Sequence, residues 1–225
     1  MAALSAGTVS ATAAPLLGRP DQGQQAIRSA AGEPVVVDVE VASTGHPFAL
    51  TRFYHWDPEA PSGLLGKGWR LSFEANLLPS SSAVILDDAD GTELVFTRLA
   101  DGSFIPPDGA AYTLAEEDGS YSLTGEDGTV RTFTAAGRLT GILDTVGKGL
   151  RLTYGASGYV ASVTDTEGRT AAFATDSAGR LVRVTLADGK RVTYAYSSRG
   201  HLMAVAGADG SVRTYTYDAQ GRLIV

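Results

Sequence analysis

Residues 217–223 read Tyr-Asp-Ala-Gln-Gly-Arg-Leu, and this stretch decides the fold because its glycine belongs to a series with a fixed period. Glycines recur every 21 residues, at Gly137, Gly158, Gly179, Gly200 and Gly221. A second series follows ten residues after the first four, at Gly147, Gly168, Gly189 and Gly210. A constant period of this length is the signature of a repeat architecture, in which each unit is one supersecondary element.

A series of large apolar residues keeps the same phase. Leu152, Phe173, Tyr194 and Tyr215 each lie five residues after a second-series glycine, and Phe133 has the same offset from Gly128. Around Tyr194, apolar residues alternate with Arg191 and Thr193, which is the pattern of a strand with one buried face. We expect these five residues to form the core of the repeats.

The turns also have a recognisable chemistry. Residues 176–179 and 218–221 begin with aspartate and end with glycine, which suits a type I turn in which the carboxylate caps the turn and the glycine accepts positive φ. We therefore interpret the nine periodic glycines as structural turn residues, and each repeat as a β-hairpin. Such a unit cannot bury its own apolar face and needs neighbours.

One feature does not fit a flat strand. Apolar residues occur two and five positions after each first-series glycine, as at Leu181 and Val184. In a regular strand these side chains would lie on opposite faces. We therefore expect a β-bulge or a strong local twist that curls the sheet.

Composition excludes several classes of function. The chain has a formal net charge of −7 and an isoelectric point near 4.9, so it lacks the basic character typical of nucleic-acid binders. It has no cysteine, which excludes disulfides and cysteine-ligated zinc. No apolar run reaches the roughly 18 residues that a membrane-spanning helix needs.

Catalytic motifs are also absent. The three histidines, His46, His55 and His201, do not stand at ligand spacing. Residues 87–91 are rich in aspartate but do not fit the register of an EF-hand loop. The sequence contains no Gly-x-Ser-x-Gly elbow and no phosphate-binding glycine motif. We therefore predict no catalytic residue, no metal site and no cofactor.

The unit at residues 217–223 resembles the YD repeat, named for its tyrosine and aspartate, of Rhs proteins, toxin-complex shells and teneurins. Residues 173–181 are a looser copy, with Thr175 where the tyrosine should stand. Residues 53–69, which include Gly63-Leu-Leu-Gly-Lys-Gly-Trp69, resemble the region that leads into the repeats in bacterial Rhs proteins.

In that family the repeats build a long sheet that spirals into a hollow shell around a C-terminal toxin. The resemblance implies an all-β fold, with a repetitive antiparallel hairpin sheet that curls as part of a β-shell. It implies a non-enzymatic structural segment of a toxin-delivery or cell-surface protein, secreted or on the bacterial surface. Its partners would be the rest of a longer Rhs-type polypeptide and a C-terminal toxin domain.

The chain divides into three parts. Residues 1–32 are expected to be a flexible leader, without the positive start and dense leucine core of a signal peptide. Residues 33–110 are expected to be an N-terminal β region that leads into the repeats. Residues 111–225 are expected to be the repeat array, which is truncated in its last repeat.

A binding module is the alternative to a shell segment. In that case exposed aromatic rings would stack on carbohydrate, and Trp56 and Trp69 are the candidate residues. The two hypotheses differ in where the tyrosines of the repeats lie: inward packing favours the shell, and an exposed stripe of rings favours the binding module.

The last strands of the array generate a prediction about association. Val212, Thr214 and Thr216 carry no charge and no proline lies among them, so we expect an unprotected sheet edge that pairs with a second copy. Lysine at positions 214 and 216 should reduce that association, as measured by light scattering over a concentration series. A monodisperse monomer at high concentration, unchanged by the two lysines, would show that the edge is already covered.

Overall fold

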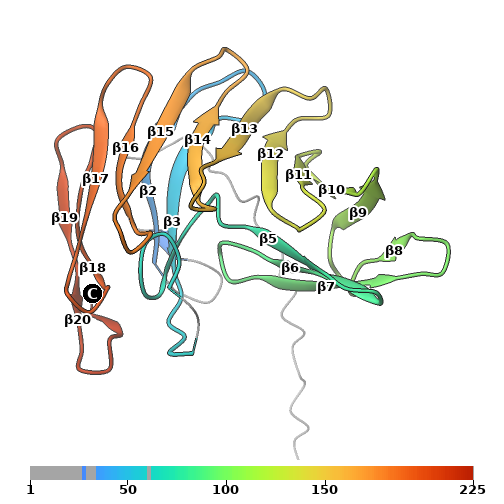
Figure 1. Cartoon of the computed structure of the whole chain (residues 1–225), viewed down its shortest axis with the longest axis horizontal. Coiled ribbons are helices and arrows are strands. Elements are labelled where there is room, and N and C mark those ends of the chain that lie inside the picture. The colour runs from blue at the N-terminus through green and yellow to red at the C-terminus, as the bar shows by residue number, and fades with distance from the viewer. Residues whose placement is uncertain (1–26, 29–33, 60–61, 225) are drawn as a thin grey trace, which may run out of the picture.

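The computed structural model describes residues 27–28, 34–59 and 62–224, and this part of the chain contains strands and no helix (Figure 1). The expected all-β fold is confirmed. Residues 1–26, 29–33, 60–61 and 225 lie outside the described part, and with them most of the expected leader. In the described part, therefore, no helix is present that could cross a membrane.

Two four-stranded antiparallel sheets precede the repeats. The first has the order β1-β2-β3-β4, and its strands are β1 (Ile27–Arg28), β2 (Pro34–Val41), β3 (Phe48–Tyr54) and β4 (Trp69–Leu71). The second has the order β5-β6-β7-β8, and its strands are β5 (Asn76–Pro79), β6 (Ala83–Asp87), β7 (Glu93–Arg98) and β8 (Phe104–Ile105).

The repeats form an 11-stranded antiparallel sheet in which every strand pairs with its neighbours in sequence. Its strands are β9 (Tyr112–Glu117), β10 (Ser120–Gly125), β11 (Val130–Phe133), β12 (Leu139–Leu143), β13 (Gly149–Tyr154), β14 (Val160–Thr164), β15 (Thr170–Thr175), β16 (Leu181–Thr185), β17 (Arg191–Tyr196), β18 (Leu202–Ala206) and β19 (Val212–Thr214). A two-stranded sheet follows, made of β20 (Thr216–Tyr217) and β21 (Leu223–Ile224).

All nine periodic glycines occupy turns of one kind. At Gly221 the amide donates to the Asp218 carbonyl at 3.0 Å, and the Asp218 amide donates to the Arg222 carbonyl at 2.9 Å. The same two bonds recur at the other eight glycines, and the φ angles of the nine lie between 78° and 87°. This is the type I turn followed by a left-handed residue that joins strands through a three-residue loop. Side chains other than glycine are strained at such φ values.

The expected bulge is confirmed, and it recurs in the four repeats that follow Gly137, Gly158, Gly179 and Gly200. Tyr154 lies opposite Val160 while Thr153 lies opposite Ser162, which leaves Ala161 as the extra residue. Equivalent register shifts make Thr140, Val182 and Met203 the extra residues of the other repeats. Because the bulge changes the phase of the strand, apolar side chains on both sides of it reach the same face: Leu181 and Val184 are both fully buried.

Consecutive repeats are joined by the tyrosine of the signature. The Tyr196 hydroxyl donates to the carbonyl of Leu181, 15 residues earlier, at 2.6 Å, and Arg180 lies 4.9 Å above the Tyr196 ring. Tyr154 and Tyr217 donate in the same way to the carbonyls 15 residues before them, each at 2.6 Å. Each tyrosine therefore holds its own repeat against the preceding one.

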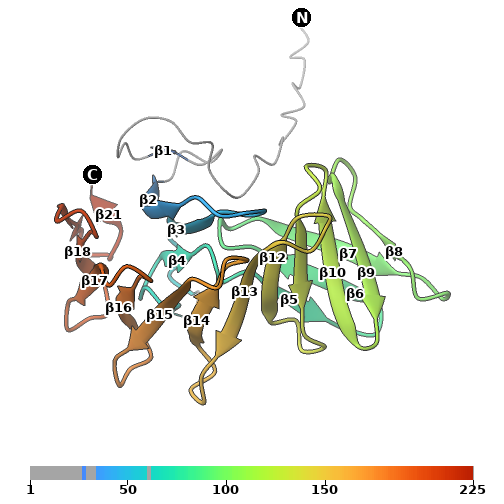
Figure 2. The same cartoon turned by 90° about the horizontal axis from the view of Figure 1, so that it is seen from above.

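The repeat sheet is curved, and the N-terminal strands lie inside the curve. Figure 2 shows the repeat strands in sequence order along an arc, with β2, β3 and β4 on its inner side. We call the strands before the repeats, β1–β8, the lead-in strands. Their buried residues and those of the repeats belong to one continuous hydrophobic cluster. The inner face of the repeat sheet is therefore buried, whereas residues such as Arg151, Thr153 and Arg191 are exposed on the other face.

The turn geometry predicts graded costs for glycine substitutions. A Cβ at Gly179 would lie 2.6 Å from Cε2 of Tyr159, and one at Gly221 would lie 2.7 Å from Cε1 of His201, in addition to the strain at positive φ. A Cβ at Gly189 would meet nothing within 4 Å. We expect Gly189→Ala to cost roughly 1–3 kcal/mol of unfolding free energy from strain alone. Gly179→Val and Gly221→Val should cost more, and Ser198→Ala, at an exposed position, close to nothing.

Denaturant unfolding of the four variants measures these differences. Equal midpoints for all four would contradict the assignment of the turns.

Candidate functional site

The most elaborate arrangement of polar side chains in the described part of the chain is the place where β2 and β3 meet the last repeats. We call it the Asp38–Arg52 cluster; it consists of Asp38, Arg52, Tyr194, Arg213 and Tyr215. The side chains of Asp38 and Arg52 are both fully buried. Buried charges are rare unless they are paired and hydrogen-bonded, so this cluster shows what holds the lead-in strands in place.

Asp38 lies at a bulge in β2. Val37 lies opposite Thr51 and Val39 lies opposite Leu50, so Asp38 is the extra residue of this strand. Regular alternation from the buried Val36 already directs Asp38 inward, and the bulge brings Val39, which is also buried, to the same face. The strand therefore places a carboxylate on the face that packs against the repeats.

Arg52 binds Asp38 through two parallel hydrogen bonds. Its Nε lies 2.6 Å from Oδ2, and its Nη2 lies 2.9 Å from Oδ1. Nη2 also donates to the Tyr215 hydroxyl at 2.8 Å. The guanidinium carbon lies 4.9 Å from the ring centre of Trp69 and 5.3 Å from that of Tyr215. Bidentate pairing and contact with aromatic faces are the interactions for which arginine is best suited.

Two further residues of the repeats complete the cluster. The Tyr194 hydroxyl donates to Oδ2 of Asp38 at 3.2 Å, and Nη1 of Arg213 lies 3.3 Å from Oδ1. Burial, together with the negative charge of Asp38, raises the pKa of Tyr194 well above its usual value, so its hydroxyl stays a donor. Burial alone would lower the pKa of Arg52, but the hydrogen bonds and charge of Asp38 raise it, so the guanidinium stays charged.

The cluster distinguishes one repeat from the others. The residues 21 and 42 positions before Arg213 are Val192 and Ala171, and those at the same distances before Tyr194 are Phe173 and Leu152. None of these four could pair with a buried carboxylate. The partners of Asp38 therefore exist at one position of the array, which fixes where β2 and β3 dock.

Further contacts lie at the first-series turns, which join the repeat strands at one of their ends. The Leu77 amide donates to the Gly137 carbonyl at 2.8 Å, and the Leu181 amide donates to the Leu64 carbonyl at 2.7 Å. The segment around Leu64 is held by the buried Glu74, whose carboxylate accepts from the Leu64 amide at 2.8 Å. Burial raises the pKa of Glu74.

At the opposite ends of the repeat strands, the segment between β2 and β3 binds a second-series turn. Glu167 accepts from the Thr44 amide at 2.8 Å and from the Ser43 hydroxyl at 2.9 Å. The hydrogen bonds from Thr44 lower the pKa of Glu167 to about 2. The region before the repeats thus contacts the turns at both ends of the repeat strands.

A second buried ion pair links the β5–β8 sheet to the start of the array. Nη1 of Arg131 lies 2.6 Å from Oδ2 of Asp88, and both side chains are nearly inaccessible. Burial raises the pKa of Asp88 even though Arg131 opposes the shift. Residues 88–91 thus form the β6–β7 turn, and Asp88 forms an ion pair.

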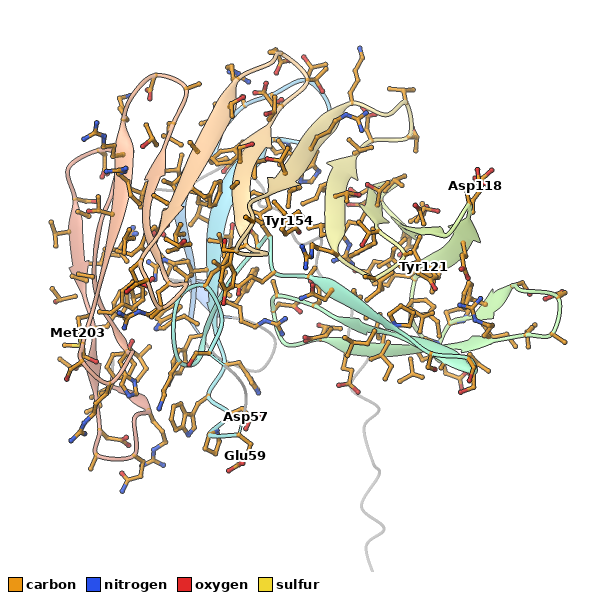
Figure 3. All side chains as sticks on the ribbon, viewed as in Figure 1. Asp57, Glu59, Asp118, Tyr121, Tyr154 and Met203 are labelled. Atoms are coloured by element: carbon orange, nitrogen blue, oxygen red, sulfur yellow. The ribbon has the colours of Figure 1, made fainter. Side chains whose placement is uncertain are left out.

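The expected core residues all lie on the inner side of the repeat sheet. Phe133, Leu152 and Tyr194 are buried, and Phe173 and Tyr215 are partly buried against the same cluster. The tyrosines of the repeats also pack inward, except Tyr159, which follows the turn at Gly158 and is exposed. Figure 3 shows Tyr121 and Tyr154 inside the curve, whereas Asp118 lies at the outer tip of the β9–β10 turn. The repeats therefore present no stripe of exposed tyrosine rings.

The two tryptophans differ. Trp69 is fully buried between the rings of Tyr54 and Tyr215, and its Nε1 donates to the Tyr217 hydroxyl at 2.9 Å. It has no accessible ring face, so the expectation of ligand stacking at Trp69 does not fit the structure. Trp56 is partly buried and lines a cavity beside the last two first-series turns.

Sequence reasoning did not single out Asp38, Arg52, Asp88 or Arg131 as paired. Asp38 did carry a signal, because it is one of two acidic residues, with Glu40, within a run of valines. No comparable signal linked it to Arg213, which lies 175 residues away.

The arrangement is suited to holding parts of the chain together. Among the described residues, no three His, Asp or Glu side chains lie close enough to hold a metal ion. His46 and His201 lie in separate places, and burial lowers the pKa of each.

Comparisons with known proteins point to one family. Residues 176–206 and 196–225 match the family model described as RHS Repeat, and residues 32–96 match a model described as Domain of unknown function (DUF6531). The tRNA nuclease WapA of Bacillus subtilis (strain 168) is 29% identical over 108 residues, which are 48% of this chain. The tRNA3(Ser)-specific nuclease WapA of Bacillus spizizenii is 30% identical over 108 residues. The chain spans about 5% of the length of these relatives.

The Asp38–Arg52 cluster predicts a large loss of stability when one partner is removed. Arg52→Ala would leave a buried carboxylate without its main partner, so we expect a cost of about 3–5 kcal/mol in unfolding free energy. As a control, Arg222→Ala removes an exposed ion pair with Asp218 and should cost no more than about 1 kcal/mol.

The double variant Asp38→Leu/Arg52→Leu tests the origin of this loss. It should be less destabilised than the sum of the two single variants, because no unpaired charge remains. Strict additivity in denaturant unfolding would contradict the pairing.

Proposed function

The chain belongs to the Rhs/YD-repeat family, and from this premise we propose that it is a structural segment of a β-walled shell that encloses or presents a C-terminal cargo. In this proposal the segment has no catalytic activity of its own. It forms part of the wall, and any catalytic activity of the whole protein belongs to another domain.

The observation that carries the proposal is the 11-stranded repeat sheet with strictly sequential strand order and one buried face. Sequential order lets a sheet grow by one hairpin at a time without rearrangement of the earlier strands. The repeated bulge supports a wall that curves in one direction, because a bulge increases the local twist of the strand that carries it.

The lead-in strands support a role inside the curve. We propose that residues 33–110 are a lead-in unit that fills and fixes the opening of the wall, and that residues 111–225 are the wall itself. The Asp38–Arg52 cluster and the Asp88–Arg131 pair would then be the two anchors between these parts.

The inward position of the tyrosines favours the shell over the adhesion module. A module that stacks the repeat tyrosines on carbohydrate would need their rings exposed, whereas Tyr121 and Tyr194 are each about 5% exposed.

The wider context is also part of the proposal. The chain would belong to a longer, secreted or surface-attached polypeptide, with a toxin domain following the repeats. The relatives named as tRNA nucleases support a nucleic-acid-cleaving toxin as one such cargo. This chain matches only about 5% of their length, so most of each relative lies outside the match.

Two measurements test the proposal. The 225-residue chain, incubated with tRNA and Mg²⁺, should release no fragments, while a nuclease control cleaves the same preparation. Cleavage that copurifies with the chain and is abolished by a single substitution would contradict the absence of catalysis.

In the longer polypeptide, Arg52→Ala should make the C-terminal domain more sensitive to limited proteolysis than Arg222→Ala does. Equal protease sensitivity of the two variants would contradict the role as a wall.

A further inference from the structure

The strands of the repeat sheet carry charge of one sign only. Strands β11–β19 all lie in the described part of the chain, and they contain five arginines and no aspartate, glutamate or lysine. The carboxylates of this part of the array lie in its turns. Two of the arginines, Arg131 and Arg213, pair with Asp88 and Asp38 on the inner side. The other three therefore set the charge of the outer face.

These three arginines, Arg151, Arg183 and Arg191, are exposed, and none of them forms an ion pair with another described residue. Each has a threonine directly opposite it on a neighbouring strand: Arg151 faces Thr164, Arg183 faces Thr193, and Arg191 faces Thr185. Opposite residues of an antiparallel pair have Cβ atoms roughly 4.5–5.5 Å apart. A guanidinium and a hydroxyl at this spacing can donate to the same anion, so the face carries three Arg–Thr pairs of one kind.

The other exposed residues of these strands are small. Strands β13–β17 lie side by side in the array (Figure 1), and their exposed residues are three arginines, three threonines and two alanines. The centre of a protein–protein interface is built from aromatic and apolar side chains, and single-stranded nucleic acid is held by stacking of its bases on aromatic rings. These strands expose neither kind of side chain. They offer cations and hydroxyls, which suit a ligand that is both anionic and polar throughout.

We propose that the outer face of β13–β17 binds a polyol phosphate polymer, that is, a flexible chain of phosphodiesters joined by glycerol-sized alcohols. Its phosphates lie on the Arg–Thr pairs, and the polyol links lie on the threonines and alanines between them. The site is on the outer side of the sheet, so it holds whether or not the repeats form a shell around a cargo.

The spacing of the Arg–Thr pairs favours a polymer over a small anion. At about 4.8 Å per strand, Arg151 in β13 lies about 14 Å from Arg183 in β16 and about 19 Å from Arg191 in β17, measured across the sheet. One phosphate cannot reach over these distances, whereas a chain of phosphates can. A phosphodiester also suits each pair, because its two unbridged oxygens accept from the guanidinium and from the hydroxyl at once.

The test measures the binding of fluorescently labelled poly(glycerol phosphate) to the full 225-residue chain by fluorescence anisotropy at low salt. Binding should saturate, and the affinity should fall steeply as salt is added, because phosphate contacts release counterions. Polyglutamate and polyuridylate of equal charge should compete at least tenfold more weakly than unlabelled polymer, and monomeric glycerol phosphate should not compete. Absence of saturable binding, or competition by any of the three that equals that of the polymer, would overturn the proposal.

Charge-matched variants locate the site. Arg151→Gln, Arg183→Gln and Arg191→Gln should each weaken binding roughly tenfold, which is the usual effect of losing one hydrogen bond to a charged group. Arg199→Gln makes the same change of charge at an exposed arginine of a first-series turn, so it should leave the affinity unchanged. Thermal unfolding checks that the four variants remain folded. Equal weakening by Arg199→Gln would reduce the effect to general attraction and overturn the site.

A variant without the hydroxyl separates phosphate recognition from attraction by charge. The Thr193 hydroxyl has no hydrogen-bond partner among the described residues, and valine suits an exposed strand position. Thr193→Val should weaken binding roughly two- to tenfold with the same salt dependence, because the number of cations is unchanged. Thr153→Val is the control, since Thr153 lies on the same face opposite Ser162 and not opposite an arginine. Equal affinities of these two variants would overturn the Arg–Thr pair as the unit of recognition.

Discussion

The pleat of a β-strand sends successive side chains to opposite faces. The four repeats that follow Gly137, Gly158, Gly179 and Gly200 each break that alternation once, at the residue three positions after the glycine. The rest of the structure depends on this break. It brings two apolar positions that would otherwise diverge to one face, so each short hairpin contributes more to the core than a regular strand could. It also bends the sheet, and the bend creates the inner space in which β2, β3 and β4 pack.

Near-identical repeats raise a problem of register, because an apolar lead-in could pack equally well against any of them. Buried charges address this problem in a way that apolar contacts cannot. Desolvating Asp38 and Arg52 is costly, and the cost is offset only where Tyr194, Arg213 and Tyr215 lie together. Docking one repeat earlier would bring Asp38 against valine and phenylalanine side chains. The ion pair therefore contributes more to the choice of position than to the total stability.

The repeats were predictable from sequence because their information is local. A turn needs a glycine at one position, a strand needs alternation, and both recur with a period that a single sequence displays; even the bulge at residues such as Ala161 could be inferred from misplaced apolar residues. The docking cluster was not predictable, since its members come from strands distant in sequence: Asp38 lies in β2 and Arg213 lies 175 residues later. The expectation of ligand stacking at Trp69 was wrong for a related reason. Whether a ring at a strand end is exposed depends on what packs over it, here Tyr54 and Tyr215. The boundary near residue 110 stays a prediction.

The tyrosine hydroxyl that reaches back 15 residues gives the array a mechanical polarity. Force applied at the C-terminal end would load the Tyr217 contact first, and with it the strands that the Asp38–Arg52 cluster holds. That first rupture would meet the strongest resistance. Once the lead-in strands separate, the remaining repeats would detach one at a time, and those that carry Tyr196 and Tyr154 would also release a hydroxyl bond to the repeat before them. Pulled through a narrow pore from this end, such a protein would yield abruptly at first and then unravel in equal steps of one repeat.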